Sequence, residues 1–202
     1  MVNSLDPYPS TPQNDPFADR PFLVFWEITR ACALACQHCR AEAQPQRHPD
    51  ELDTEESLAL IKQLGELAPP MLILTGGDPV MRRDLFTLVR AANAEGLRVG
   101  LSPAATARLD KMNFHDLREA GVQRMSLSLD GATRETHDAF RKVSGTFDRT
   151  IDARWRAEEA GIPIQINTTL TASNLDEFAA FRDLMFELKP AMWSVFILVP
   201  TG

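Results

Sequence analysis

The chain of 202 residues is poor in cysteine, and its three cysteines all fall between positions 32 and 39. A disulfide-stapled secreted domain would carry an even number spread along the chain, so this class is excluded. No apolar run approaches the roughly 20 residues that cross a bilayer, and residues 1–20 lack the basic start and apolar stretch of a signal peptide. These absences predict a cytoplasmic protein with no membrane partner.

Basic residues are also in short supply, with 21 Lys and Arg against 28 Asp and Glu. The net charge of -7 argues against nucleic acid as a partner, because binding a phosphate backbone requires an excess of cations. The rest of the composition is that of an ordinary globular protein, 44% hydrophobic and 24% charged, in a chain long enough to enclose one sizeable core.

Residues 1–20 are rich in proline and polar residues and predict a disordered lead-in to one domain over 21–202. In that domain, short apolar runs alternate with helical patterns. The predicted strands are 22–29, 71–75, 97–102, 122–129, 164–169 and 193–199. The predicted helices are 53–67, 84–95, 113–120, 147–160 and 174–188, the first capped by Asp53 or Thr54 and the last by Asn174.

Helical patterns that end in glycine just before an apolar strand are typical of an α/β domain with a parallel sheet and right-handed crossovers. Periodicity alone fits both a TIM-like partial barrel and an open doubly wound sheet. The chain stops directly after the sixth predicted strand. We therefore expect a sheet that is truncated there and a C-terminal domain that is missing.

The cysteines form the pattern C-x3-C-x2-C in the loop after the first predicted strand. Three thiolates in one loop can ligate three irons of a [4Fe–4S] cubane and leave the fourth iron open to a ligand. The alternative is a zinc ion held by these cysteines with His38 or His48, although the second C-x2-C pair usual in structural zinc sites is missing. Either site would lie at the carboxyl edge of the sheet, where α/β proteins bind ligands.

A second candidate segment, Gly76-Gly-Asp78-Pro79, follows the second predicted strand. Two residues without side chains allow the backbone to approach a ligand closely, and Asp78 can fix the loop or add negative charge. An ordinary turn has the same composition, so this segment alone does not indicate a binding site. It supports one only together with the other motifs.

Polar and apolar residues alternate on the fourth and fifth predicted strands. Ser126, Ser128 and Asp130 therefore share one face of the fourth strand. The corresponding polar set on the fifth strand is Gln165, Asn167 and Thr169. Central parallel strands are usually apolar on both faces, so two adjacent polar faces predict a cofactor cavity. Arg141, further along the chain, could pair with a carboxylate through its forked guanidinium.

In combination, these motifs resemble those of the radical S-adenosylmethionine (SAM) superfamily, and of its SPASM-type members in particular. The resemblance extends from Phe22 to Gly202 and depends on five segments in the expected order. They are the cysteine motif after Trp26-Glu-Ile-Thr29, Thr75-Gly-Gly-Asp78-Pro79, Ser126 to Gly131, His137 to Arg141 with Gly145-Thr-Phe147, and Phe196 to Gly202.

The resemblance implies a partial TIM-like (βα)6 barrel with parallel strands that binds a [4Fe–4S] cluster and cleaves SAM to a 5′-deoxyadenosyl radical. The radical would abstract hydrogen from a ribosomally made peptide, which we favour by analogy, or from a haem-type tetrapyrrole. Flavodoxin or ferredoxin would supply the electron. The cluster ligands would be Cys32, Cys36 and Cys39, and the SAM-binding residues would be Gly76, Gly77, Asp78, Ser128, Asp130, Arg141 and Asn167.

The chain departs from the family pattern in three places. Ser102-Pro-Ala-Ala105 stands where many relatives carry a Thr-Asn-Gly type segment, so Ser102 is the polar candidate that remains there. Asp78 replaces the commoner Glu, and no cysteine after Cys39 is available for an auxiliary cluster. A non-catalytic binding module stabilised by zinc or a cluster, and an inactive fragment, are the alternatives to an active enzyme.

Overall fold

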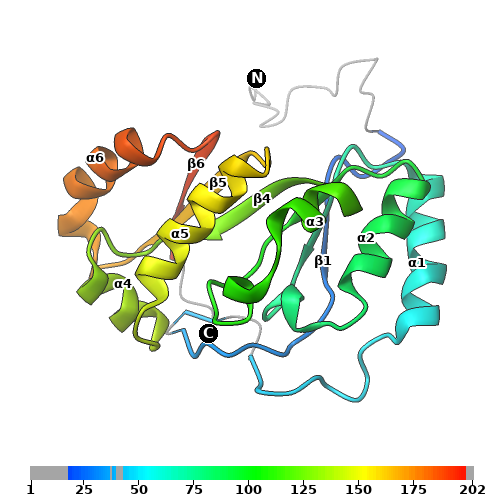
Figure 1. Ribbon diagram of the computed structural model, residues 1–202, viewed down its shortest axis with the longest axis horizontal. Coiled ribbons are helices and arrows are strands. Elements are labelled where there is room, and N and C mark those ends of the chain that lie inside the picture. Colours follow the sequence, from blue (N-terminus) through cyan, green and yellow to red (C-terminus); the bar gives the residue numbers. More distant parts are fainter. Residues whose placement is uncertain (1–17, 37, 40–42, 199–202) are drawn as a thin grey trace, which may run out of the picture.

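The computed structural model describes residues 18–36, 38–39 and 43–198. Parts of three predictions lie outside these residues. They are residues 1–17 of the lead-in predicted over 1–20, Val199 of the last predicted strand, and Pro200 to Gly202 at the end of the last motif. Six parallel strands form one sheet whose spatial order follows the chain order (Figure 1). They are β1 (Val24–Glu27), β2 (Leu72–Thr75), β3 (Val99–Leu101), β4 (Val122–Ser128), β5 (Ile164–Leu170) and β6 (Met192–Ile197).

Helices connect the strands, and five of them were predicted at nearly the observed bounds. They are α1 (Thr54–Leu67), α2 (Leu85–Ala94), α3 (Phe114–Ala120), α5 (Thr146–Glu159) and α6 (Phe178–Leu188). A sixth helix, α4 (Arg134–Arg141), was not predicted. Short 3-10 turns span Pro79–Met81, Leu109–Lys111 and Leu175–Glu177. No helix within the described residues is long and apolar enough to cross a membrane.

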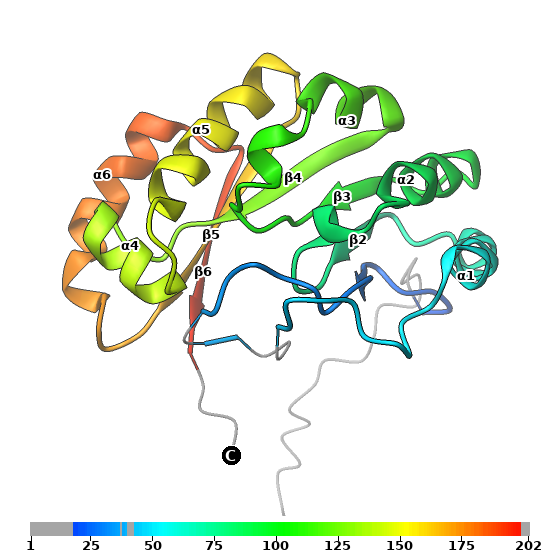
Figure 2. The same cartoon turned by 60° about the horizontal axis from the view of Figure 1, so that its bottom comes forward.

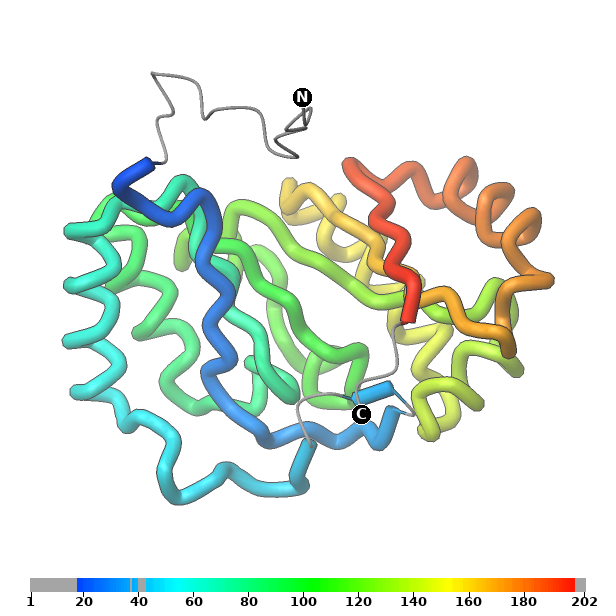
Figure 3. The backbone as a smooth tube through the Cα atoms, turned by 180° about the vertical axis from the view of Figure 1, so that it is seen from behind, coloured from blue at the N-terminus to red at the C-terminus, as the bar shows by residue number. Residues whose placement is uncertain are grey.

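The sheet is curled, with the helices on its outer face and a concave inner face left open (Figure 2). The two edge strands, β1 and β6, flank the opening and do not pair with each other (Figure 3). A doubly wound sheet would reverse its strand order near the middle, whereas this order runs without reversal. The prediction of a partial TIM-like barrel of parallel strands is therefore confirmed.

The core lies between the outer face of the sheet and the helices. Met125 and Leu127 of β4 and Ile166 of β5 have no solvent-accessible surface, and they alternate with half-buried polar residues. Those polar residues are Ser126, Ser128, Gln165, Asn167 and Thr169, on the concave face. The predicted polar inner faces are confirmed for these five residues, because only one side of each strand meets a helix. Asp130, predicted to share the face of Ser126 and Ser128, instead lies beyond the end of β4 and is buried.

Side-chain caps mark the start of three of the helices, α1, α3 and α4. At the start of α1, the Asp53 side chain accepts from the Glu56 backbone N–H at 2.9 Å, and the Glu56 carboxylate accepts from Asp53 N–H at 2.9 Å. This reciprocal pair is a capping box. The prediction that Asn174 caps the last helix is wrong, because its amide reaches back to other loops and a 3-10 turn intervenes before α6.

The unpredicted helix α4 escapes sequence patterns because it is short and polar. Only His137 and Phe140 of its residues are buried. Its position is set by a close approach: a Cβ on Gly131 would lie 2.1 Å from the His137 backbone nitrogen. Glycine at 131 therefore lets the loop after β4 run against the first turns of α4, which aims one face of the helix at the carboxyl edge of the sheet.

Candidate active site

The cysteine segment leaves β1 and returns to close on itself. Ala31 and Gln44 form an isolated parallel bridge, in which Cys32 N–H donates to Gln44 carbonyl at 2.8 Å and Gln44 N–H donates to Arg30 carbonyl at 3.0 Å. The bridge fixes both ends of the segment at the carboxyl edge of the sheet, as the sequence predicts.

All three cysteines line one cavity of about 260 Å³ at this edge. The cavity is also lined by Gly76, Gly77, Ala104, Arg141, Glu27, Leu34, His38 and Ala43. Burial raises the pKa of the Cys32 thiol to about 11, so this thiol is protonated in the free protein and must lose its proton to bind a metal. No three His, Cys, Asp or Glu side chains of the described residues converge as ligands of a single metal ion.

The two glycines of this cavity lie against the backbone that leads into the cysteine segment, and we call Thr29 to Ala31 together with Gly76 and Gly77 the glycine wall. Gly77 N–H donates to Thr29 carbonyl, and Asp78 N–H donates to Ala31 carbonyl, both at 2.7 Å. A Cβ at Gly76 would lie 2.3 Å from the Thr29 oxygen, and one at Gly77 would lie 2.6 Å from the Ala31 oxygen. The glycines are thus required by contact with the chain entering the cysteine segment, in addition to any ligand.

Asp78 has no solvent-accessible surface and lies behind the glycine wall rather than in a cavity. Its carboxylate accepts from Thr106 Oγ1 at 2.9 Å, Ala104 N–H at 3.2 Å and Val80 N–H at 3.3 Å. Burial raises the pKa of Asp78 to about 6, against the lowering effect of these hydrogen bonds. The side chain therefore joins the loops after β2 and β3, which is the loop-fixing role foreseen from sequence.

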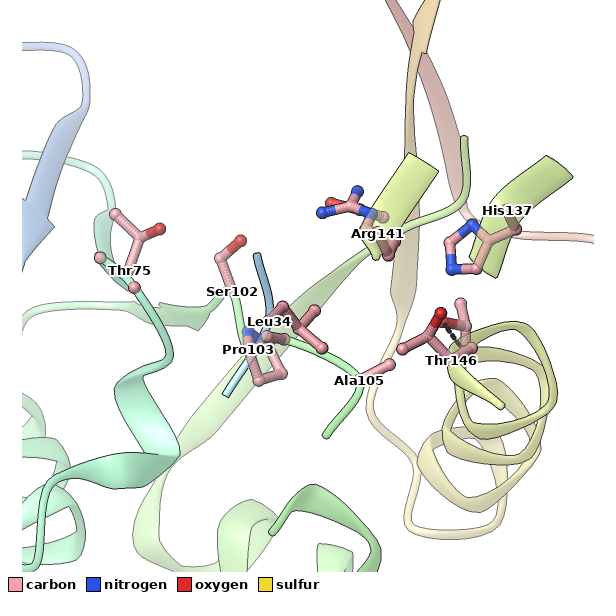
Figure 4. A pocket seen from close by; sticks show the side chains of 13 residues that line it. Leu34, Thr75, Ser102, Pro103, Ala105, His137, Arg141 and Thr146 are labelled. Atoms are coloured by element: carbon pink, nitrogen blue, oxygen red, sulfur yellow. Dashed lines mark hydrogen bonds between the residues drawn. The ribbon is translucent and has the colours of Figure 1, made fainter. Parts of the chain in front are cut away.

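A second cavity of about 150 Å³ adjoins the first, sharing Leu34, both glycines, Ala104 and Arg141 with it (Figure 4). Ser102 and Ser128 line it from β3 and β4. The α5 residues Thr146 and Thr150 also line it, as do Thr75, Pro103, Ala105 and His137. His137 and Arg141 stand one turn apart on α4 and so present the same face of that helix.

Asp130, directly after β4, holds this face of α4 in place, and we call Asp130, His137 and Arg141 the α4 wall. The Asp130 backbone N–H donates to His137 Nδ1 at 3.1 Å, and its carboxylate forms an ion pair with Arg141. Burial, with the Arg141 cation nearby, lowers the pKa of His137 to about 4. His137 is therefore neutral at pH 7, with its remaining proton on Nε2.

The predicted site residues fall into two groups. Cys32, Cys36, Cys39, Gly76, Gly77, Ser128 and Arg141 line the two adjoining cavities. Asp78 behind the glycine wall and Asp130 within the α4 wall line neither cavity, at 0% and 1% exposure. Asn167 lies on the concave face, where it accepts from Gln165 Nε2 at 2.9 Å. Sequence reasoning missed Thr146 and Thr150 as site residues. The predicted helix began at residue 147, one residue after Thr146, so the i,i+4 spacing of the pair on α5 was not visible.

The two histidines considered as zinc ligands lie apart from each other. His38 lines the cysteine cavity against the Phe140 ring, at 4.7 Å between ring centroids, and its buried Nδ1 has no hydrogen-bond partner among the described residues. His48 Nδ1 instead accepts from Asp50 N–H at 3.2 Å, outside the cavity.

A family model with the description "Radical SAM superfamily" matches residues 26–185. The chain belongs to the radical SAM superfamily. Among curated relatives, the AdoMet-dependent heme synthase of Oleidesulfovibrio alaskensis is 48% identical over 180 residues, 89% of this chain and 46% of that protein. The mycofactocin maturase MftC of Mycobacterium tuberculosis is 34% identical over 172 residues, 80% of this chain and 41% of that protein.

This radical SAM chain spans about half the length of the curated relatives it matches. Among solved structures, Streptococcus suis SuiB bound to S-adenosylmethionine matches 91% of this chain and 42% of its own, with a TM-score of 0.78 and 17% identity. At that identity the likeness shows the fold, and it agrees with the half-barrel described above.

The radical SAM family binds a [4Fe–4S] cluster and SAM, and the donors in the larger cavity suit that pair. A cubane cluster takes each thiolate on a different iron, so three thiols around one cavity match it better than they match one zinc ion. His38 Nδ1, which has no partner in the described part of the chain, and the shared glycine wall give a bound group polar atoms to meet. Family membership and these donors favour the cluster over the zinc alternative.

Proposed function

We propose that this chain is the core of an enzyme that cleaves SAM reductively and uses the resulting radical to abstract hydrogen from its substrate. The observation that carries the proposal is the junction of two cavities across Gly76, Gly77 and Arg141. One cavity gathers the three cysteines of a superfamily motif, and the other has the polar lining that an amino acid and a nucleoside require.

Each residue of the junction has a role in this proposal. Cys32, Cys36 and Cys39 hold the cluster, which when bound supplies the electron that splits SAM into methionine and a 5′-deoxyadenosyl radical. Backbone groups of the glycine wall meet the SAM ammonium, and the Arg141 guanidinium faces its carboxylate.

Other residues of the cavities and walls orient SAM and exclude water. Ser128 would face the ribose from the concave face, together with Asn167, its direct register partner on β5. Asp78 and Asp130 hold the loops and α4 without touching SAM. Pro103, Ala104 and Ala105 give one side of the smaller cavity an apolar surface that suits the adenine ring.

A haem-type tetrapyrrole is the substrate class we propose. Three relatives with the printed name AdoMet-dependent heme synthase are 41% to 48% identical to this chain, whereas mycofactocin maturase MftC is 34% identical and PqqA peptide cyclase 30%. This ordering reverses the preference for a ribosomal peptide that motif analogy alone suggested. We further propose a flavodoxin or ferredoxin as electron donor, in a reducing cytoplasm that keeps the three thiols free.

The test is anaerobic reconstitution with iron and sulfide, reduction by dithionite, addition of SAM, and mass spectrometry of 5′-deoxyadenosine. We expect a brown protein that yields 5′-deoxyadenosine and methionine. Cys36→Ala should lose both the bound iron and the product to background, whereas Lys62→Ala, an exposed change on α1, should keep both. A colourless protein that holds one zinc, or a brown one that never cleaves SAM, would contradict the proposal.

The substrate is tested by binding. Titration with iron coproporphyrin should shift the Soret absorption of the tetrapyrrole in proportion to protein, and a peptide bearing no tetrapyrrole should not compete. If the spectrum is unchanged while SAM cleavage persists, the tetrapyrrole assignment fails and the radical chemistry stands.

A further inference from the structure

Arg141 joins a buried carboxylate to one particular cysteine. Its guanidinium forms an ion pair with Asp130 on one side and donates from Nη1 to Cys36 Sγ at 3.5 Å on the other. Among the described residues, it is the one side chain that donates to a cysteine sulfur; Cys32 Sγ accepts only from the Leu34 backbone N–H, at 3.4 Å. The three thiols therefore have unequal surroundings, and within the described part of the chain Cys36 is the one that accepts from a cationic side chain.

Asp130 has almost no freedom to move. One carboxylate oxygen accepts from Thr169 N–H at 2.7 Å while the other faces Arg141. Its backbone carbonyl accepts from Asn174 Nδ2 at 2.9 Å, and its N–H donates to His137. With 1% of its surface exposed, Asp130 is fixed by β5, by the loop before α6 and by α4 together.

A carboxylate fixed in this way fixes the cation it pairs with. The Arg141 side chain is 12% exposed, so solvent screens its charge weakly and Asp130 is its main counter-charge. Hydrogen bonds to the sulfur ligands of an iron–sulfur cluster are among the factors that set its reduction potential. A cation beside a thiolate stabilises the cluster state that carries the additional electron.

On the basis of the proposed function, we propose that Arg141 raises the reduction potential of the cluster through Cys36, and that Asp130 is the positioning residue that holds Arg141 there. The step is a one-electron transfer: the reductant gives one electron, [4Fe–4S]2+ becomes [4Fe–4S]1+, and no bond forms or breaks. This role is separate from any contact of Arg141 with SAM, because it operates before SAM binds.

The experiment is a redox titration of the reconstituted protein without SAM, followed by the electron paramagnetic resonance signal of the reduced cluster. At a fixed potential near the midpoint, Arg141→Met should lower the ratio of reduced to oxidised cluster about tenfold, which is 59 mV for a one-electron couple. Arg182→Met, which removes an exposed arginine on α6 paired with Asp183, is the matched control and should leave the ratio unchanged.

Asp130→Asn is measured in both backgrounds, because a double-mutant cycle isolates the coupling between two residues. We expect Asp130→Asn to shift the ratio in the parent chain and to have no effect once Arg141 is methionine. An equal shift in both backgrounds would overturn the positioning role, and an unchanged ratio in Arg141→Met would overturn the effect on potential.

Two further measurements keep these outcomes interpretable. Iron and sulfide contents are compared first; if Arg141→Met does not retain the cluster, Arg141→Lys replaces it. Lysine keeps the charge but cannot fork between two partners, so we expect about a threefold lower ratio, and no change would overturn the inference. A parent protein that never binds a cluster contradicts the proposed function itself, whereas a cluster that cleaves SAM with an unaltered potential contradicts only this inference.

Discussion

The glycine wall and the α4 wall face the same cavities but are built from different materials. The glycine wall is held by backbone hydrogen bonds between Gly77 or Asp78 and the chain at Thr29 and Ala31. The α4 wall is held by side chains and by charge, through Asp130, His137 and Arg141. Backbone contacts depend on shape and vary little with pH, whereas the second wall depends on the ionisation of its members.

The difference matters because each wall faces a different part of the proposed cofactors. A backbone wall offers hydrogen-bonding groups that no protonation change can remove. A wall of buried charge can adjust the electrostatics of the cavity through small changes in position. We expect an added side chain to disrupt the glycine wall by a steric clash, and protonation of His137 in acid to disrupt the α4 wall.

The largest effect should come from breaking the glycine wall with Gly76→Ala. Gly76 has a φ of 135°, and a Cβ there would meet the Thr29 backbone oxygen at 2.3 Å. We expect the free energy of unfolding to fall by about 4 kcal/mol, from the left-handed backbone and the clash together. Denaturant unfolding measures it.

The control for that change is Gly96→Ala. Gly96 also has a positive φ, 78°, but a Cβ there meets nothing within 4 Å. The loss should be about 1 kcal/mol, the cost of the backbone conformation alone. Equal losses at the two positions would mean that the close approach of the two loops contributes nothing.

A smaller effect, visible only in acid, is expected from the α4 wall. The folded-state pKa of His137 is lowered to about 4, so His137 stabilises the fold fully above about pH 6.5, its usual pKa. That contribution should be lost as pH falls from 6.5 to 4, by about 3 kcal/mol in the free energy of unfolding.

His137→Gln should flatten this pH dependence, since glutamine does not titrate. Unfolding by urea is followed at half-unit steps between pH 4 and pH 7. His115→Gln, which changes an exposed histidine on α3, should retain the slope of the parent chain. A slope that survives in His137→Gln would place the acid sensitivity elsewhere.

The smallest effect should come from Thr106→Val, which removes one hydrogen bond from Asp78 behind the glycine wall. The pKa of Asp78 is already raised to about 6 by burial, and the loss of the Thr106 donor should raise it further. We expect a loss of about 1 to 2 kcal/mol at pH 7 and less below pH 6, where the carboxyl is protonated.

Thr150→Val is the matched control, because Thr150 is equally buried but donates to the Thr146 backbone carbonyl at 2.9 Å. Its cost should not change between pH 5 and pH 7. If the two variants respond to pH in the same way, Asp78 does not titrate in this range.

The sequence named residues of both walls, Gly76 and Gly77 in one and Asp130 and Arg141 in the other, but it did not predict the helix that carries Arg141. The cysteine spacing and the adjacent glycines are local patterns that the sequence shows directly. The alternation of polar and apolar residues likewise predicted the polar faces of β4 and β5. Helix α4 has little apolar periodicity, since His137 and Phe140 are its only buried residues. Its position is set by the contact of Gly131 with His137 and by the bonds from Asp130 to His137 and Arg141. These are tertiary contacts, which a local sequence pattern does not show.

The contacts that the selected residues make were harder to predict than which residues to select. The two glycines were expected to admit a ligand, yet they also admit the backbone at Thr29 to Ala31. Asn174 was expected to cap a helix but ties the loops after β4 and β5 together. In both cases the residue type marked a position of structural importance, but the group that it contacts is known only from the tertiary structure.

The bridge between Ala31 and Gln44 turns the cysteine segment into a closed ring. Closing a flexible loop costs entropy that grows with its length. Here the loop is closed during folding by the bridge between Ala31 and Gln44. An inorganic cofactor therefore binds to a segment whose two ends are already held together. The connection between Gln44 and α1 supports the ring from outside, because Glu51 within it accepts from Arg30 N–H at 2.7 Å and from Thr29 Oγ1 at 3.2 Å. A change in its length should therefore reach the ring through Glu51.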